Sequence, residues 1–291
     1  MEVDGVEISR PDKVLWPALG VTKRDYAEYL RTLADRMLPG LRERPLTVVR
    51  APDGVEAHRY YQKDAPKHTP DWIRTVTIRA ESAGRDVRYI VCRDRRTLLW
   101  LGNQAAIEFH PALIRASRLE RPDVLVFDID PPSGAFAEAA EVARAVHQVL
   151  GEHALPHGLK TSGAKGLHVF VPLERRHTGD QVRAAGFTLG TEVVERIPDL
   201  ATMEFRKRER KGRVFLDVTR NGGGQTVVAA YSPRVRSEGT VSFPIAWEDL
   251  SDVEPGDFTL LSVPGLLDGP GPRRWRELEG IRSRLPLALT R

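Results

Sequence analysis

Short apolar runs alternate along the chain with amphipathic stretches of helical period. The clearest helix spans residues 22–42, where Thr22 is suited to the N-cap position and apolar residues recur every three or four positions. Further helices are predicted at residues 102–109, 135–150 and 178–197 and around Trp275. Apolar or alternating runs predict strands at residues 46–50, 88–91, 123–130, 159–161, 167–172, 214–218 and 227–231.

The order of the elements in the middle of the chain narrows the fold class. From residue 123 to residue 218 it runs strand, helix, strand, strand, helix, strand. That order is a split βαβ pattern, in which helices cover one face of a compact, palm-like sheet. No internal repeat, low-complexity tract or long Gly/Ser linker divides the sequence. We therefore expect a mixed α/β fold of the α+β type.

Composition and charge exclude several classes of protein. With 291 residues, of which 41% are hydrophobic and 29% charged, the chain can bury a sizeable core without covalent cross-links. The single cysteine, Cys92, excludes a disulfide framework or a cysteine-based zinc site within the chain. There is no secretory signal and no run of ~18 apolar residues, so we expect a cytoplasmic protein with no membrane partner. A net charge of +4 does not by itself establish a nucleic-acid partner.

Candidate chemistry begins with carboxylates at the end of an apolar strand. In Val-Leu-Val-Phe-Asp-Ile-Asp-Pro-Pro (124–132), Asp128 and Asp130 lie two positions apart and so point to the same face. Two like charges at this spacing favour a cation between them, and Mg²⁺ or Mn²⁺ prefers oxygen ligands. Asp217, near the end of another apolar strand, is a third candidate for a site that holds two metals. Haloacid-dehalogenase-type phosphatases also place Asp-x-Asp after such a strand, but Pro132 departs from their usual continuation.

A glycine-containing hairpin supplies groups that suit an anion. Residues 160–173 read Lys-Thr-Ser-Gly-Ala-Lys-Gly-Leu-His-Val-Phe-Val-Pro-Leu, which is not a Walker loop. Gly163 and Gly166 allow a close approach of the backbone, Ser162 offers a hydroxyl and Lys165 a positive charge. His168 lies on the following strand, where it could contact a triphosphate. From these residues alone, an ordinary hairpin with a lysine at its tip and a hydrogen-bonded histidine is the slightly favoured alternative.

Four segments together resemble the primase-polymerase domain of bacterial LigD, in the archaeo-eukaryotic primase superfamily. They are Pro-Asp-Lys-Val-Leu-Trp-Pro (11–17), Phe-Asp-Ile-Asp-Pro-Pro (127–132), Thr-Ser-Gly-Ala-Lys-Gly-Leu-His-Val (161–169) and Ala-Ala-Tyr-Ser-Pro-Arg (229–234). The resemblance runs from about Ser9 to about Trp275, and the order and spacing of the segments make it specific.

The resemblance implies a catalytic and nucleotide-binding role for each matching residue. Asp128, Asp130 and Asp217 are expected to be the catalytic metal ligands. The nucleotide-binding residues are expected to be His110, Ser162, Lys165, His168, Arg220 and Arg234, with His110 near the nucleotide sugar and phosphates. Some relatives carry Gln at the Arg220 position. Without the resemblance, His110 would be read as a helix-end histidine before Pro111.

The resemblance also implies contacts with DNA. Lys13 and Lys23 are expected to form a pocket for a 5′-phosphate on the downstream strand. Tyr60 and Tyr61 fall where relatives carry paired aromatic residues beside the template, on which a base can stack. Arg50 is expected to contact the template or the nucleotide. The basic run 206–213 suits contact with a nucleic-acid backbone, and a solvated loop is an equal alternative for it.

The function that the resemblance implies is polymerisation of nucleotides, preferably ribonucleotides, on primer 3′ ends at DNA breaks or gaps. The expected cofactors are two divalent ions, Mn²⁺ or Mg²⁺, and the substrates are NTPs or dNTPs. The expected protein is a monomer close to the bacterial nucleoid, with DNA ends or a gapped 5′-phosphorylated duplex as partners and Ku and a separate DNA ligase as candidate partners. Gap filling in excision repair, a non-catalytic DNA-end-binding module and an aspartate-nucleophile phosphatase are the alternatives.

The resemblance also divides the chain within one domain. An N-terminal subdomain with the 5′-phosphate pocket is expected at about residues 1–120. The catalytic palm is expected at about residues 121–235, followed by a C-terminal extension at about 236–291.

Overall fold

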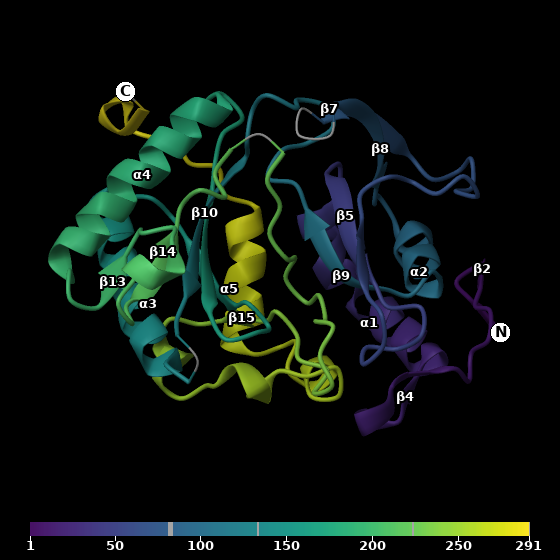
Figure 1. Ribbon diagram of the computed structural model, residues 1–291. Coiled ribbons are helices and arrows are strands. Elements are labelled where there is room, and N and C mark those ends of the chain that lie inside the picture. The colour runs from purple at the N-terminus through teal and green to yellow at the C-terminus, as the bar shows by residue number, and fades with distance from the viewer. Residues whose placement is uncertain (81–83, 133, 223, 291) are drawn as a thin grey trace.

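The alternating segments fold into two β-sheets that stand side by side, each with its own helices (Figure 1). This computed structural model describes residues 1–80, 84–132, 134–222 and 224–290. The first sheet comes from the middle and C-terminal parts of the chain, and the second comes from the N-terminal part. We call these parts the six-stranded half and the five-stranded half.

The six-stranded half contains the predicted split βαβ pattern. Its strand order is β13-β14-β10-β12-β11-β15, and all neighbours are antiparallel except β13 and β14. The strands are β10 (Val124–Asp130), β11 (Gly158–Thr161), β12 (Leu167–Pro172), β13 (Ala201–Thr202), β14 (Val214–Asp217) and β15 (Pro244–Ile245). The helices are α3 (Phe136–Glu152), α4 (Gly179–Arg196) and α5 (Pro270–Glu279).

The two faces of this sheet differ because side chains alternate along its strands. On β10, Leu125, Phe127 and Ile129 are fully buried in the core that includes α3 and α4. Figure 1 shows α3 and α4 together on one side of the sheet. On the other face, Trp275 of α5 packs against Phe170 of β12, with ring centroids 5.3 Å apart. Asp128 and Asp130 alternate with these buried residues along β10 and so lie on this second face.

The five-stranded half is built around β5. The strand order is β6-β5-β8-β7, and β9 pairs with the other edge of β5. These strands are β5 (Pro45–Arg50), β6 (Tyr60–Gln62), β7 (Thr75–Ala80), β8 (Arg85–Val91) and β9 (Ala106–Pro111). Helices α1 (Lys23–Leu41) and α2 (Arg95–Asn103) pack against each other beside this sheet (Figure 1).

Short elements complete the chain. Two small antiparallel pairs precede α1, formed by β1 (Glu2–Val3) with β2 (Val6–Glu7) and by β3 (Val14–Trp16) with β4 (Val21–Thr22). The 3₁₀ helices are η1 (Pro17–Leu19), η3 (Lys207–Glu209), η4 (Glu248–Ser251), η5 (Pro255–Asp257), η6 (Val263–Gly265) and η7 (Leu287–Thr290). No helix in the described part of the chain is long and apolar enough to cross a membrane.

The structure confirms the α+β fold and most predicted elements. Thr22 is the N-cap of α1 and forms a capping box with Asp25, as its position before the amphipathic stretch predicted. The predicted helix at residues 102–109 is wrong, because α2 ends at Asn103 and Ala105 turns the chain with a φ of 55° into strand β9. The residues that follow form an antiparallel ladder with β5 instead of a further helical turn.

The predicted strand at residues 227–231 is also wrong. Ala230 and Tyr231 form a turn, with a φ of 65° at Tyr231, and the backbone hydrogen bonds of the segment go to two different partners. Ala229 N–H donates to Phe109 O at 2.8 Å, and Tyr231 N–H donates to Ser242 O at 2.6 Å. The segment therefore connects the two halves instead of extending either sheet.

Candidate active site

One row of polar side chains crosses four strands of the six-stranded sheet. In the antiparallel register, Lys160 of β11 pairs with His168 of β12, His168 pairs with Asp128 of β10, and Asp128 pairs with Asp217 of β14. Directly paired residues of antiparallel strands point to the same face. The register thus brings the predicted residues His168, Asp128 and Asp217 together, and Asp130 lies two positions further along β10 on the same face.

The carboxylates of this row stand in a strongly perturbed electrostatic environment. Burial, and then the negative charge of Asp128, raise the pKa of Asp130 above its usual range. For Asp128, burial is outweighed by His168 and Arg220, which lower its pKa. Arg220 Nε lies 3.2 Å from Asp217 Oδ2 and 3.7 Å from Asp128 Oδ2, so one cation already bridges two of the carboxylates.

The donor set fits a hard divalent cation. Three carboxylates on neighbouring strands offer the oxygen ligands that Mg²⁺ and Mn²⁺ prefer. Within the described residues, no three His, Cys, Asp or Glu side chains are arranged to hold an ion as they stand. Arg220 lies between two of the carboxylates and is 45% exposed, so its side chain has room to move away from them.

Lys160 was not recognised from the sequence, although it anchors one end of the row. Its side chain is fully buried, and Nζ lies 2.7 Å from His168 Nδ1 and 2.5 Å from Ser242 Oγ. Ser242 donates its own hydroxyl hydrogen to Thr161 O, so the serine oxygen accepts from Lys160. The pKa of Asp128 is lowered, so its carboxylate is ionised and can only accept from His168 Nε2; the ring proton therefore resides on Nε2, and Nδ1 accepts from Lys160. His168 Nε2 lies 3.2 Å from Asp128 Oδ1, and burial together with Lys160 lowers the pKa of His168 to about 4.

The loop between β11 and β12 keeps its shape through glycines that the sequence singled out. Gly163 has a φ of 69°, and a Cβ there would come within 2.7 Å of Ser242 N. A Cβ on Gly166 would lie 2.1 Å from Ile129 O, so this position admits no side chain. Both glycines therefore let the loop approach the end of β10 and the segment around Ser242.

Ser162 organises the same loop and keeps a hydrogen to donate. Its Oγ accepts hydrogen bonds from Ala164 N at 3.2 Å and Gly166 N at 3.1 Å. The hydroxyl proton is therefore free to face an anion. Lys165, at the tip of the loop, is exposed, and its charge opposes the rise in the pKa of Asp130 that burial and Asp128 cause.

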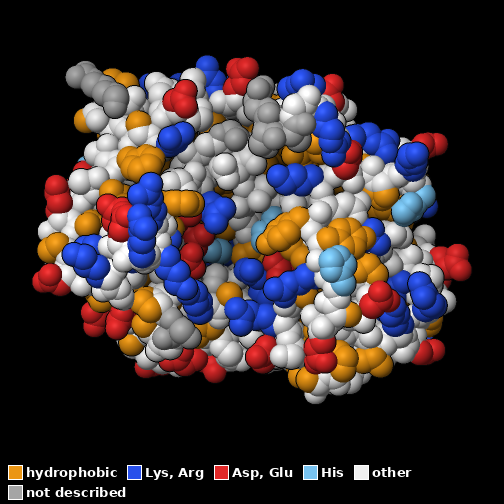
Figure 2. Space-filling view, viewed as in Figure 1, with side chains coloured by type: hydrophobic (Ala, Val, Ile, Leu, Met, Phe, Trp, Pro, Cys, Tyr) orange, Lys and Arg blue, Asp and Glu red, His pale blue; other side chains and the backbone are white. Residues whose placement is uncertain are grey.

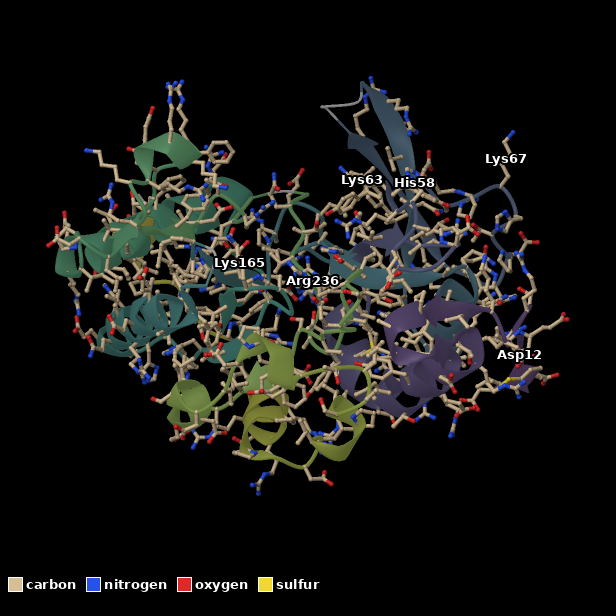
Figure 3. The ribbon with its side chains drawn as sticks, turned by 60° about the horizontal axis from the view of Figure 1, so that its bottom comes forward. Asp12, His58, Lys63, Lys67, Lys165 and Arg236 are labelled. Carbon is tan, nitrogen blue, oxygen red and sulfur yellow. The ribbon has the colours of Figure 1, made fainter. Side chains whose placement is uncertain are left out.

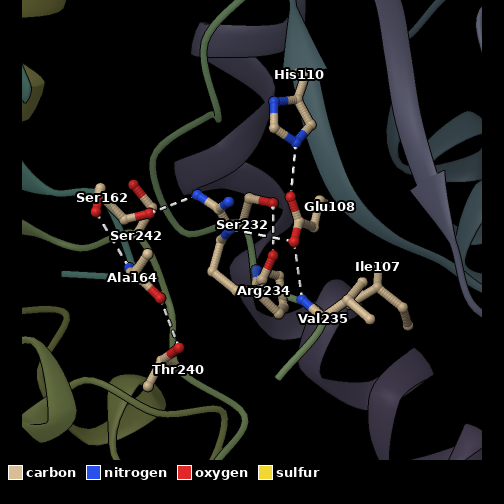
Figure 4. A network of polar contacts seen from close by, with 12 residues as sticks. Ile107, Glu108, His110, Ser162, Ala164, Ser232, Arg234, Val235, Thr240 and Ser242 are labelled. Carbon is tan, nitrogen blue, oxygen red and sulfur yellow. Dashed lines mark hydrogen bonds and ion pairs between the residues drawn. The ribbon is translucent and has the colours of Figure 1, made fainter. Parts of the chain in front are cut away.

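A second polar network joins the five-stranded half to this loop (Figure 4). Glu108 and His110 lie two positions apart on β9, and His110 Nε2 lies 2.8 Å from Glu108 Oε2. Arg234 Nε lies 3.2 Å from Glu108 Oε1, while Arg234 Nη1 donates to Ser162 O at 2.8 Å. The network brings the predicted residues His110, Arg234 and Ser162 together, and it adds Glu108, which the sequence reading missed.

Four cations gather near the start of α1. Lys23 is buried and donates to Ser9 O at 2.9 Å and to Ser9 Oγ at 3.0 Å. Burial, followed by the charges of Arg10, Lys13 and Arg50, lowers the pKa of Lys23 to about 8. Lys13 lies beside it through a backbone hydrogen bond from Lys23 N to Lys13 O and forms an ion pair of 2.7 Å with the exposed Asp53. The mutual repulsion of these four cations indicates that a bound anion would be stabilised here.

Arg50 and the two tyrosines form the nearby surface. Arg50 donates to Gln104 O at 2.6 Å and to Gln62 Oε1 at 2.9 Å, and its guanidinium lies 5.6 Å from the ring centroid of Tyr60. Neither predicted tyrosine belongs to the core: Tyr60 is 36% and Tyr61 is 69% exposed. The Tyr61 ring lies 6.1 Å from that of His110, so it borders the second network.

The basic run at residues 206–213 is only partly free. Arg210 stacks 3.7 Å over the ring of Phe215 and donates to Glu204 O and Phe205 O. Arg206 and Arg208 point to solvent and pair with Glu209 at 3.6 and 3.4 Å. The run therefore combines structural arginines with exposed ones.

One face of the molecule is hollowed near its centre (Figure 2). In the space-filling view, acidic and histidine side chains lie at the bottom of a depression near the centre, and Lys and Arg side chains surround it (Figure 2). In the turned view, Lys165 and Arg236 lie between the two halves, whereas Lys67 and Asp12 lie at the outer edge of the five-stranded half (Figure 3). Such a depression, acidic at the bottom and basic at the sides, suits a polyanion bound together with cations.

Two signals in the sequence could have found the missed residues. Lys160 is a lone cation in the predicted strand Leu-Lys-Thr (159–161), two positions before Ser162 and so on the same face. Glu108 precedes His110 by two positions, but the segment was read as a helix, in which residues i and i+2 do not share a face. Recognition of β9 as a strand would have paired Glu108 with His110.

Comparisons with known proteins identify a family that this chain resembles over most of its length. The family model described as "LigD, primase-polymerase domain" matches residues 22–279. The multifunctional non-homologous end joining protein LigD of Pseudomonas aeruginosa is 33% identical over 290 residues, which cover 99% of this chain and 34% of that protein. The bifunctional LigD of Bacillus subtilis is 31% identical over 255 residues, or 87% of this chain and 41% of that protein. The chain thus spans about a third of the length of the first of these relatives.

A solved structure extends the comparison to the fold. The polymerase domain of Mycobacterium tuberculosis ligase D, determined in complex with DNA, superposes with a TM-score of 0.88 at 30% sequence identity. The match covers 96% of this chain and 99% of that domain. The two-half architecture described above is therefore the architecture of a known domain.

Proposed function

Because the chain belongs to the family of LigD primase-polymerase domains, we propose that it is a template-directed polymerase that extends primer 3′ ends at DNA breaks or short gaps. The observation that carries the proposal is the register of the six-stranded sheet. It aligns Asp128 with Asp217 on one side and with His168 on the other. Carboxylates for a metal and donors for a triphosphate thus lie next to each other on one face.

Asp128, Asp130 and Asp217 would hold Mn²⁺ or Mg²⁺. When bound there, two such ions would activate the primer 3′-hydroxyl and stabilise the leaving pyrophosphate. The residues around the site do the positioning. Arg220 lies where a cation is needed, and we infer that it turns from the carboxylates to the triphosphate when the site is filled.

The triphosphate would be held from two sides. Ser162 offers a free hydroxyl hydrogen, Lys165 a mobile charge and His168 an Nε2–H, all from the β11–β12 hairpin. Arg234 approaches from the segment that connects the two halves and is oriented by Ser162 O. His110 would contact the nucleotide sugar, and a preference for ribonucleotides would rest on a contact with the 2′-hydroxyl.

The five-stranded half would hold the DNA. The structural neighbour is described as a polymerase domain in complex with DNA, and the relatives are named for non-homologous end joining. In this chain, Lys13 and Lys23 would bind the downstream 5′-phosphate, and Arg50 would hold Tyr60 in place beside the template. Tyr61 would offer an exposed ring for stacking on a base. We propose end joining, with Ku and a separate ligase, as the process that uses the activity of this monomer near the nucleoid.

We also propose a subdivision of the chain by task. Residues 1–120 would form the DNA-binding subdomain and residues 121–235 the catalytic palm. The extension at 236–291 contributes β15 and α5, which pack on β11, so we infer that it stabilises the palm.

Single-nucleotide extension of a primer across a gapped duplex tests the proposal. The substrate carries either a 5′-phosphate or a 5′-hydroxyl on the downstream strand, and each is offered ribo- and deoxynucleotides with Mn²⁺ or Mg²⁺. We expect extension by the wild type, stimulated by the 5′-phosphate, and loss of that stimulation in Lys13→Ala. Failure to incorporate any nucleotide, with DNA binding retained in Asp217→Asn, would instead indicate an end-binding module. A stable aspartyl-phosphate at Asp128 would indicate a phosphatase, and equal extension of both gapped substrates would remove the role of Lys13 and Lys23.

A further inference from the structure

The two ring nitrogens of His110 have different surroundings. Nε2 lies 2.8 Å from Glu108 Oε2, inside the polar network of Figure 4. Nδ1 points away from that network, and none of the residues that the structure describes forms a hydrogen bond with it. The ring lies 6.1 Å from the ring of Tyr61, which is exposed. One nitrogen is therefore fixed by the protein, and the other is available to a ligand.

Glu108 decides which nitrogen carries the proton. Its Oε1 accepts a hydrogen bond from Val235 N at 2.9 Å and lies 3.2 Å from Arg234 Nε. Burial alone would raise the pKa of Glu108, but His110 and Arg234 outweigh it and lower the pKa to about 2. An ionised carboxylate only accepts hydrogen bonds. His110 Nε2 must therefore be the donor to Glu108.

The opposite nitrogen then carries a lone pair. Burial lowers the pKa of His110, so the ring is neutral near pH 7. A neutral imidazole protonated on Nε2 has an unprotonated Nδ1, which only accepts. His168 has the same tautomer but a reversed arrangement, because Lys160 occupies its Nδ1 and its Nε2–H faces Asp128 Oδ1. The row of the six-stranded sheet thus contains a histidine that donates from Nε2 to a site carboxylate, and the second network contains a histidine whose free nitrogen accepts.

We propose that Glu108 is a positioning residue for sugar selection: it holds His110 so that Nδ1 accepts a hydrogen bond from the 2′-hydroxyl of the incoming nucleotide. The inference rests on the proposed polymerase function. The Nδ1 lone pair can accept a hydrogen bond from the 2′-hydroxyl of a ribonucleotide. A deoxynucleotide has a hydrogen on carbon in that place and cannot form this bond. The ribo preference would then depend on a residue that touches no part of the substrate.

Glu108→Gln is the informative variant because it keeps the shape of the side chain. Val235 N–H and Arg234 both need an acceptor, so the amide oxygen would take the place of Oε1. The amide nitrogen would then face His110 and donate to Nε2. That exchange moves the ring proton to Nδ1 and turns the acceptor into a donor.

The measurement is kcat/KM for a ribonucleotide and for its deoxy counterpart, on the gapped duplex with Mn²⁺. We expect Glu108→Gln to lower the ribo-to-deoxy ratio by about tenfold, the effect of one hydrogen bond. A purely structural role, or a displaced Arg234, would lower both values together and leave the ratio unchanged. That outcome would overturn the inference.

Glu192→Gln is the matched control. Glu192 forms the same kind of pair with His153 Nε2, at 2.9 Å, on α4 and away from the depression. This variant should leave the ratio at the wild-type value. A ratio that falls in Glu192→Gln as it does in Glu108→Gln would show a nonspecific effect and contradict the inference.

A double-mutant cycle tests whether Glu108 acts through His110. His110→Ala should lower the ratio as much as Glu108→Gln does, and the double variant should show no further change. Thermal denaturation of each variant confirms that it is folded. A further fall of the ratio in the double variant would mean that Glu108 acts by another route.

Nuclear magnetic resonance separates this inference from the polymerase proposal. Long-range ¹H–¹⁵N spectra report the tautomer of each of the eight histidines, and His110→Ala assigns the signals of His110. We expect Nε2–H in the wild type and Nδ1–H in Glu108→Gln. An Nδ1–H tautomer in the wild type overturns the inference even if the protein is an active polymerase. With Nε2–H but no polymerase activity, the tautomer assignment stands, and sugar selection falls with the proposed function.

Discussion

The two halves of the molecule hold their candidate site residues in different ways. In the six-stranded half, Lys160, His168, Asp128 and Asp217 form one row, and the pairing of four neighbouring strands determines their positions. In the five-stranded half, contacts with other segments hold several of the site residues. Arg50 donates to Gln104 O, and His110 depends on Glu108, which in turn depends on Val235, 127 positions away in the chain.

This difference separates two tasks. A row on a sheet places charged groups rigidly, which suits metal ions and phosphates because electrostatic stabilisation depends on preorganisation. Residues that are held by separate segments can each contact a different part of the substrate. That arrangement suits recognition of a sugar, a base and a DNA end. We therefore expect changes in the six-stranded half to affect every substrate alike, and changes in the five-stranded half to affect selectivity.

Asp217→Asn should have the largest effect. The variant removes a charge from the carboxylate row but keeps an oxygen that can accept from Thr219 N and Oγ, as Asp217 Oδ1 does at 2.8 and 2.6 Å. Single-turnover incorporation should fall about 10³-fold for ribo- and deoxynucleotides alike, because a metal ligand contributes several kcal/mol to the transition state. DNA binding, measured by fluorescence anisotropy, should remain. Incorporation near the wild-type rate would refute the metal site.

Lys160→Met should have the next largest effect. It leaves His168 Nδ1 and Ser242 Oγ without their buried donor, at a cost of about 2 kcal/mol. If that cost falls on the transition state, kcat/KM should fall about 30-fold for both types of nucleotide. Lys67→Met, which changes an exposed lysine at the outer edge of the other half, is the control and should have no effect. A change confined to one type of nucleotide would contradict the assignment of this row to the phosphates.

Tyr61→Ala should weaken the interaction with the template. The ring is exposed and is proposed to stack on a base, an interaction worth about 1.4 kcal/mol, or about tenfold in affinity. Tyr61→Phe keeps the ring and should bind as the wild type does. Titration of the gapped duplex measures both, and equal loss in the two variants would point to the hydroxyl group instead.

The pH dependence of Lys23 should be the smallest effect. Its pKa of about 8 lies below the unfolded value, so its contribution to stability is present at high pH and is lost as the pH falls through about 8. Binding of the 5′-phosphate has the opposite dependence on pH, because the protonated, charged form of Lys23 binds it and is lost as the pH rises. The preference for a 5′-phosphate should therefore decline as the pH rises from 7 to 9, by about threefold, since bound phosphate helps to retain the proton.

Lys23→Arg is the control for this effect. Arginine stays charged throughout this pH range, so the variant should lose the pH dependence of the phosphate preference. An identical decline in wild type and Lys23→Arg would show that another group titrates.

The same contrast between the halves explains what the sequence could predict. The strands of the six-stranded half were found because side chains alternate on β12 and because an apolar run ends in carboxylates on β10. The shared face of Asp128 and Asp130 followed from strand geometry. Glycines at 163 and 166 were singled out for a close approach, which the structure shows against Ser242 and Ile129.

The elements and site residues that the sequence did not predict depend on contacts between distant parts of the chain, which no local sequence pattern indicates. The turn at Ala105, with its positive φ, divides one apolar stretch into the end of α2 and strand β9. Residues 227–231 read as a strand because they are apolar, but their hydrogen bonds go to Phe109 and Ser242 in different parts of the molecule. No sequence pattern indicated that Lys23 is buried and donates to Ser9. The family resemblance supplied roles for His110 and Lys23 that the pattern of residues could not.

One experiment tests the division between the halves most directly. It measures kcat/KM for a ribonucleotide and its deoxy counterpart in the wild type, Lys160→Met and Glu108→Gln, on the same gapped, 5′-phosphorylated duplex. We predict that Lys160→Met lowers both values and leaves their ratio unchanged, whereas Glu108→Gln lowers the ratio. A ratio that changes equally in both variants, or in neither, would contradict the division of tasks, and a wild type that incorporates neither nucleotide would contradict the polymerase proposal itself.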